Sequence, residues 1–85
     1  MTSIWTANYE NNTIKVENTW FKGERLYVND ELQDDTKSLM SAVLTGHLIN
    51  SKGERENIKV NLGGFTRVSC KLFINDKLVE VTQEK

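Results

Sequence analysis

The chain has 85 residues, a length that fits one domain spanning residues 1–85, and its 11 basic and 12 acidic side chains give a net charge of −1. This balance lacks the basic excess typical of nucleic-acid-binding domains, and it lacks an acidic excess as well. A lone cysteine, Cys70, excludes an internal disulfide and a cysteine-based zinc site. No apolar run approaches the ~20 residues that cross a membrane, and the N-terminal residues lack the features of a signal peptide. We therefore expect a single cytoplasmic domain without membrane contact.

The first part of the chain alternates apolar and polar residues in short runs. Ile14 and Val16, for example, share one face of an extended segment, while Lys15 and Glu17 take the other. This period of two, rich in β-branched residues, is typical of half-buried strands. Proline is absent, and asparagine, aspartate and glycine, which favour tight turns, separate the runs. The expected strands are residues 3–8, 13–17 and 25–28, with turns at residues 11–12, 22–24 and 29–30.

Residues 35–46 allow two interpretations. Their leucine, methionine and alanine residues favour a helix that Gly46 would end. As a strand, the same segment would place Met40, Ala42 and Leu44 on one face. We expect a strand, because the neighbouring segments are strands and because the family resemblance described below requires one.

The last third of the chain repeats the alternating pattern at greater length. Val68, Cys70, Leu72 and Ile74 line one face over seven residues, which predicts a strand with that face buried. Further strands are expected at residues 58–62 and 78–81, with turns at residues 51–54, 63–64 and 75–76. Together these segments predict an all-β fold, a compact antiparallel β-sandwich of about 6–8 short strands joined by tight hairpins.

Two segments of the chain resemble each other. Residues 25–32 and 71–78 both read basic, leucine, aromatic, β-branched, Asn, Asp, charged, leucine. A duplication would place two equivalent hairpins in the fold. Convergence is the alternative, because an Asn-Asp turn between ordinary strands recurs in many β domains.

No catalytic or metal site is predicted, and no cofactor. The only histidine, His47, has no nucleophile or carboxylate paired with it in the sequence. Cys70 falls on the apolar face of its strand, where a free cysteine behaves as a small core residue. The acidic pair at residues 34–35 lacks the spacing of a calcium loop, and the Gly-Gly pair at residues 63–64 lacks the lysine of a phosphate loop.

Aromatic residues are the candidates for a binding surface. Tyr27 and Phe73 occupy matched positions on the faces opposite the aliphatic stripes of their strands, and Trp20 lies in the aromatic N-terminal quarter. If the aliphatic stripes form the core, these rings belong to an exposed apolar patch that could bind a partner or a second subunit. The alternative is a sheet covered on both faces, in which the rings are internal.

The order of strands and turns resembles the Fas apoptosis inhibitory molecule family. The resemblance spans most of residues 13–81 and is carried by generic hairpin motifs, with Asp30 and Asp76 where the family's turns have glycine. It implies a compact antiparallel β domain that is non-enzymatic and acts through protein contacts. The matching segments are Ile14-Lys15-Val16-Glu17, residues 22–30, Thr45-Gly46-His47-Leu48-Ile49, Ile58-Lys59-Val60, Gly64-Phe65 and residues 70–78.

These observations rank the possible functions. A small non-enzymatic β-sandwich module that acts through protein–protein contacts, as a homo-oligomer or with another protein, comes first. A small β-barrel that binds single-stranded nucleic acid is the alternative, which the exposed aromatics allow and the balanced charge opposes. A carrier of a small ligand has little room for a cavity in so short a chain. An enzyme is the class that the sequence supports least.

Overall fold

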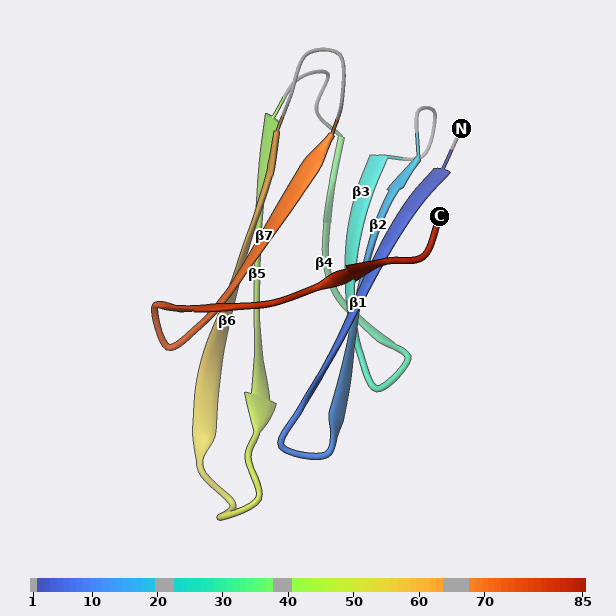
Figure 1. The fold of residues 1–85 in the computed structure, drawn as a ribbon. Coiled ribbons are helices and arrows are strands. Elements are labelled where there is room, and N and C mark those ends of the chain that lie inside the picture. Colours follow the sequence, from blue (N-terminus) through green and yellow to red (C-terminus); the bar gives the residue numbers. More distant parts are fainter. Residues whose placement is uncertain (1, 20–22, 38–40, 64–67) are drawn as a thin grey trace.

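A computed structural model describes residues 2–19, 23–37, 41–63 and 68–85 of the chain (Figure 1). Within these ranges the chain forms nine strands and no helix, so the described part holds no helix that could cross a membrane. The strands are β1 (Thr2–Tyr9), β2 (Asn12–Thr19), β3 (Gly23–Val28), β4 (Glu31–Thr36), β5 (Ser41–Ile49), β6 (Arg55–Gly63), β7 (Ser69–Ile74), β8 (Lys77–Val79) and β9 (Thr82–Gln83).

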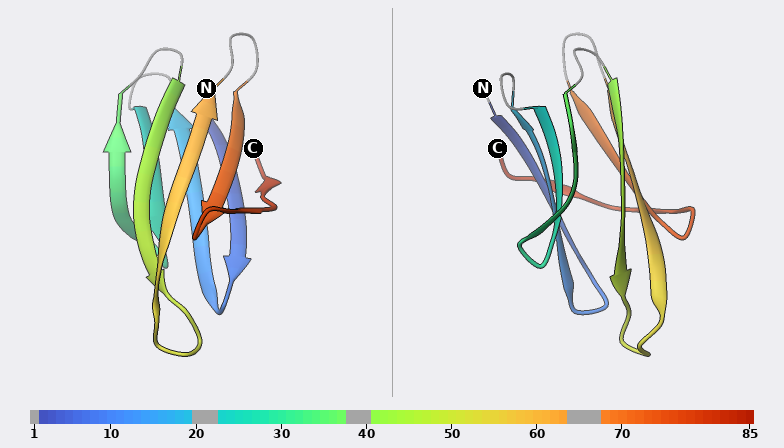
Figure 2. Two further views of the ribbon diagram at one scale, coloured as in Figure 1. Left: turned by 90° about the vertical axis from the view of Figure 1, so that its left-hand side faces the viewer. Right: turned by 180° about the vertical axis from the view of Figure 1, so that it is seen from behind.

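The strands form two antiparallel sheets that lie face to face (Figures 1 and 2). The first sheet has the order β4-β3-β2-β1-β9 and the second has the order β5-β6-β7-β8. After β8 the chain crosses from the second sheet to the first, where β9 pairs with β1. The predicted all-β antiparallel sandwich is therefore confirmed, but the described residues form nine strands where about 6–8 were expected, because most of β4 and the two-residue β9 lie outside the expected strands.

Residues 35–36 and 41–46 are strand and not helix, as expected, but they do not form one strand: they belong to two strands of different sheets, and Lys37 lies in neither. β4 ends at Thr36 and β5 begins at Ser41, while Met40 lies outside the described residues. Ala42 and Leu44 are both buried, as a strand with one inward face requires. Burial of this face outweighs the modest helix propensity of alanine and leucine.

The core lies between the sheets and is built from alternate positions along each strand. Leu26, Leu44, Val60 and Leu72 are completely inaccessible to solvent. Of the stripe predicted for β7, Leu72 and Ile74 are fully buried, while Val68 and Cys70 are half-buried and pack against the edge of the core. The other fully or nearly fully buried apolar residues are Trp5, Ala7, Ile14, Val16, Val28, Ala42, Leu48, Ile58 and Leu62.

Three hairpins use two-residue turns in which both residues have positive φ. Asn29 and Asp30 have φ of 51° and 68°, and Asn75 and Asp76 have φ of 49° and 66°. Turns of this kind match the twist of the flanking strands, and asparagine and aspartate tolerate the left-handed conformation. The first turn lies at residues 10–11, one position before the predicted one, because Asn12 is the first residue of β2 and is buried.

The two halves of the chain repeat one four-strand unit. β1–β4 and β5–β8 are each antiparallel meanders in which consecutive strands are neighbours. Val16 pairs with Leu26 in the first meander as Val60 pairs with Leu72 in the second. The similar segments 25–32 and 71–78 are thus the third and fourth strands of equivalent units.

The turn asparagines extend this equivalence to individual hydrogen bonds. The Asn29 side chain accepts from the Thr13 backbone N–H, and the Asn75 side chain accepts from the Asn57 N–H, both at 2.9 Å. The amide of Asn29 donates to Asn12 Oδ1 at 2.9 Å, and the amide of Asn75 donates to Glu56 Oε1 at 3.1 Å. Each asparagine therefore ties its turn to the start of the second strand of its unit, β2 for Asn29 and β6 for Asn75.

Side chains of β4 cover the edge of the second sheet. Gln33 accepts a hydrogen bond from the His47 backbone N–H at 2.9 Å, and Asp34 accepts one from the Thr45 N–H at 2.8 Å. These bonds satisfy backbone donors of the edge strand β5 that would otherwise be open to pairing. Gly46 leaves room for this contact, because a Cβ there would lie 2.7 Å from Gln33 Oε1 and the Gln33 side chain would have to shift.

Candidate interaction surface

The outer faces of the sheets carry the candidate aromatic residues. Tyr27 and Phe73 alternate with buried neighbours in β3 and β7, so both rings face away from the core, and both are partly exposed. Trp20, the third candidate, lies outside the described residues. The rings point away from the core as predicted, whereas their role in binding stays a prediction.

Each ring lies beside an exposed leucine on the neighbouring strand. Tyr27 pairs with Leu32 of β4, and Phe73 pairs with Leu78 of β8. Leu32 is 53% exposed and Leu78 is 66% exposed. The two sheets therefore present equivalent apolar pairs. The sequence signal that points to the two leucines is their shared place as the last residue of the similar segments 25–32 and 71–78.

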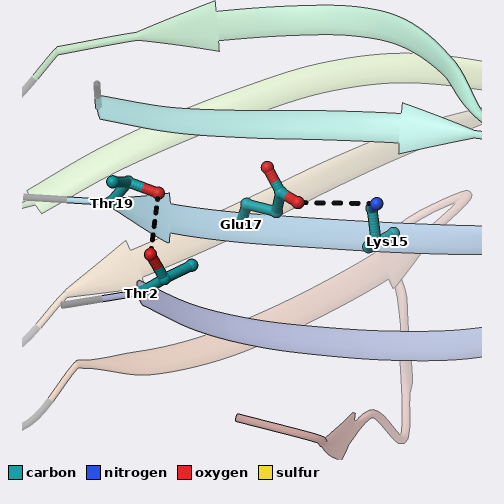
Figure 3. A network of polar contacts seen from close by, with 4 residues as sticks. All are labelled: Thr2, Lys15, Glu17 and Thr19. Atoms are coloured by element: carbon teal, nitrogen blue, oxygen red, sulfur yellow. Dashed lines mark hydrogen bonds and ion pairs between the residues drawn. The ribbon is translucent and has the colours of Figure 1, made fainter.

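The outer face of the first sheet has balanced charges. Lys15 forms an ion pair with Glu17 at 3.4 Å (Figure 3), and its ammonium lies 4.8 Å from the centre of the Tyr27 ring. Arg25 lies between Glu17 on β2 and Asp35 on β4. The pKa of the Arg25 guanidinium is raised, first by the Tyr27 hydroxyl and further by the two carboxylates. Each cation of this face thus has an acidic neighbour.

The outer face of the second sheet is cationic. Arg55, Lys59 and Lys71 are exposed on it, and no outward-facing position of strands β5–β8 carries a carboxylate. Lys59 takes the place of Lys15, and Lys71 takes the place of Arg25, but Asn61 replaces Glu17 beside it. Alternation in these strands is visible in the sequence, whereas the shared sign of their outward charges becomes visible only when the strands are placed in one sheet.

Exposed aliphatic side chains accompany these cations. Val43 is 57% exposed and Ile49 is 51% exposed on β5, at the far side of the same face from Leu78. On the β5 side, residues of β4, β5 and β6 border an open depression of about 680 Å³, and Leu32, His47, Arg55 and Lys59 are among the side chains that line it.

His47 and Cys70 occupy separate parts of the molecule. His47 lies on the outward face of β5, at the depression, whereas Cys70 faces inward on β7. Partial burial raises the pKa of the Cys70 thiol to about 12, so the thiol is protonated at neutral pH. No group of three or more histidine, cysteine, aspartate or glutamate residues with the geometry of a metal site occurs in the described ranges.

A polar network closes the end of the sandwich where the turns of residues 10–11, 29–30 and 75–76 lie. The carboxylate of Glu56, only 9% exposed, accepts hydrogen bonds from the Tyr9 hydroxyl at 2.9 Å and from the Asn50 amide at 2.8 Å, in addition to Asn75. Asn12 donates to the Ile49 carbonyl at 2.9 Å. These bonds link the two sheets. They have the character of structural contacts, because every oxygen of Glu56 is already occupied by a donor of the chain itself.

Comparison with known proteins adds no relative. No known protein family, curated protein or solved structure matches the chain. The resemblance to the Fas apoptosis inhibitory molecule family therefore stays a prediction drawn from the residues quoted above, and the function must be argued from the surface itself.

Proposed function

We propose that the chain is a non-enzymatic β-sandwich module that acts through protein–protein contacts made by its outer sheet faces, with self-association as one form of such contact. The observation that carries this proposal is the pair of equivalent apolar rows, Tyr27 with Leu32 and Phe73 with Leu78, on the two faces that the sandwich leaves uncovered. Exposed apolar patches promote association, and aromatic residues are enriched at the centres of protein interfaces.

A module that binds single-stranded nucleic acid is the second candidate. Phe73 pairs with Lys59 across β6 and β7, and Lys71 lies on the same face. A ring between cations is the arrangement on which a base stacks while its phosphate is neutralised. Such binding would weaken steeply as the salt concentration rises.

The test of the proposal removes both rings without removing the core. Binding partners are first identified with the wild-type protein and purified. They should bind about tenfold more weakly to the double variant Tyr27→Ser with Phe73→Ser, as expected when interface aromatics are lost. Mass by light scattering measures self-association in parallel, and urea unfolding measures stability. The matched control is Tyr27→Phe with Phe73→Tyr, which retains a ring at each position.

Two results would contradict the proposal. A serine variant that fails to fold, while the ring-retaining control folds, would assign the rings to the core. A folded serine variant with wild-type mass and wild-type partner affinity would show that the rings take no part in association.

A further inference from the structure

The second sheet differs from the rest of the molecule in the sign of its surface charge. The whole chain has a net charge of −1, yet Arg55, Lys59 and Lys71 project from one outer face without a carboxylate among the outward positions of strands β5–β8. The acidic residues lie elsewhere, including β4, the turns and the buried Glu56. A cationic face on a weakly acidic protein attracts an acidic partner and orients its approach.

The apolar residues of the same face add a second requirement for the partner. Val43, Ile49 and Leu78 are each more than half exposed, and they lie on the two outermost strands of the sheet, with the cations of β6 and β7 between them. A partner that satisfies both groups carries aliphatic side chains among its acidic ones. The depression beside Arg55 and Lys59 offers a recess for one such side chain.

We infer that the outer face of the second sheet docks a protein segment in which acidic residues are interleaved with aliphatic ones. This inference rests on the proposed function and adds to it the face used and the chemistry of the partner. The first sheet, whose outer cations are matched by Glu17 and Asp35, does not bind the same segment.

The surface favours a protein segment over a nucleic acid. Platforms for single strands present several aromatic rings in succession, whereas the outward strand positions of β5–β8 carry a single Phe, Tyr or Trp ring, that of Phe73. Contact with a phosphate backbone removes little apolar surface from water, so exposed aliphatic side chains contribute little binding free energy there. Contact with other aliphatic side chains removes such surface and stabilises the complex.

The test begins with the wild-type protein and two defined probes. One is a short synthetic peptide that alternates glutamate with leucine, and the other is an oligothymidylate of similar length. Each is titrated into isotopically labelled protein while backbone amide shifts are followed. The peptide should shift amides of Thr45, Asn57, Lys59 and Phe73 and leave those of β1 and β2 unchanged. A peptide with lysine in place of glutamate should not bind.

The internal repeat supplies matched variants for the same measurement. Lys59→Glu with Lys71→Glu reverses the charge of the second sheet and should weaken peptide binding by at least about fivefold, a usual effect of reversing charges at an interface. Lys15→Glu with Arg25→Glu makes the equivalent change in the first sheet and should alter the affinity less than about twofold, because screened, distant charges contribute little. Should a glutamate variant fold poorly in urea unfolding, Lys59→Gln with Lys71→Gln tests the same charges.

Three outcomes would overturn the inference: no peptide binding at millimolar concentration, amide shifts confined to the first sheet, or an oligothymidylate that displaces the peptide at equal concentration and salt. None of them decides the proposed function by itself. That proposal fails if the variant lacking both rings keeps wild-type association, or if it alone fails to fold, so the failures of the two proposals are distinguishable.

Discussion

The two halves of this chain have the same strand arrangement and core positions but differ in the charge of their outer faces. Inward positions agree, as Ile14 corresponds to Ile58 and Leu26 to Leu72, and the turn asparagines make corresponding hydrogen bonds. Outward positions agree in part, as Lys15 corresponds to Lys59, but their net charge differs, because Glu17 of the first half corresponds to Asn61 of the second. Packing and turn geometry admit few residues, while a solvated outer position admits many. Differences on the outer faces therefore carry information about function that the shared scaffold does not.

The match between halves extends beyond the two similar hairpins. The triplets Ile14-Lys15-Val16 and Ile58-Lys59-Val60 occupy the same place in β2 and β6 and pair in the same register with the following strand. Convergence on a common turn explains one hairpin but not the preceding strand as well. This longer equivalence favours duplication of a four-strand unit.

The largest expected effect tests whether the two halves contribute equally to the core. Leu26→Ala and Leu72→Ala each remove an equivalent side chain that is inaccessible to solvent, so each should cost about 3–4 kcal/mol of the free energy of unfolding. Urea unfolding monitored by circular dichroism measures both, with Leu78→Ala, on the exposed leucine, as a control that should cost under about 0.5 kcal/mol. A difference of more than about 2 kcal/mol between the two core variants would break the equivalence.

The next effect sharpens the comparison where the halves differ. Glu56 corresponds to Asn12 as the acceptor for a turn asparagine, but it also accepts bonds from Tyr9 and Asn50. Glu56→Ala should lower the free energy of unfolding by about 2–3 kcal/mol, because it leaves several donors unpaired. Glu56→Gln should lower it by about 1 kcal/mol less than Glu56→Ala does. The hydrogen bond to Glu56 also raises the pKa of Tyr9, so this pKa should fall in both variants when tyrosine absorbance is titrated.

Equal stability of wild type and Glu56→Ala would show that this network contributes nothing to the contact between the sheets. If the pKa of Tyr9 stays raised in Glu56→Ala, the Glu56 carboxylate is not what raises it, and the 2.9 Å contact between the two side chains is contradicted.

The smallest expected effect concerns Cys70, which takes the place in β7 that Glu24 takes in β3. Partial burial raises the pKa of the Cys70 thiol to about 12, whereas the unfolded thiol ionises near about 8.5. Between these two pKa values the folded state therefore holds one more proton than the unfolded state. The free energy of unfolding should be constant with respect to this group below about pH 8.5 and should fall as the pH rises above it. The decline relative to Cys70→Ala should be at most about 1.4 kcal/mol per pH unit, the value for one proton.

Thiol reactivity gives an independent measurement of the same group. At pH 8 native Cys70 should react with Ellman's reagent at least about tenfold more slowly than a free cysteine, because the thiolate is the reactive form. Rapid reaction in the folded protein, or identical pH dependence of stability in wild type and Cys70→Ala, would show that the thiol is not held in its neutral form.

The sequence by itself determined most of the strands, the hairpin turns at residues 29–30 and 75–76, and most of the inward-facing residues. Alternation placed Ile14, Leu26 and Leu72 in the core, because a strand turns successive side chains to opposite sides. Asparagine and aspartate identified the hairpins at residues 29–30 and 75–76, because few other residues tolerate positive φ. These are local properties, and they also sufficed to place Tyr27 and Phe73 on the outer faces.

Only the tertiary structure decided which strands share a sheet and what lies across from each residue. The first turn lies one residue earlier than its asparagines suggested, because Asn12 is held by Ile49 of the other sheet. The pairing of β9 with β1 likewise depends on a chain crossing that no local pattern indicates. The cationic outer face arises because β5–β8 form one sheet, which brings Arg55, Lys59 and Lys71 together from separate segments. Such neighbours are distant in the sequence, and their proximity follows from packing of the whole chain rather than from the preference of any one segment.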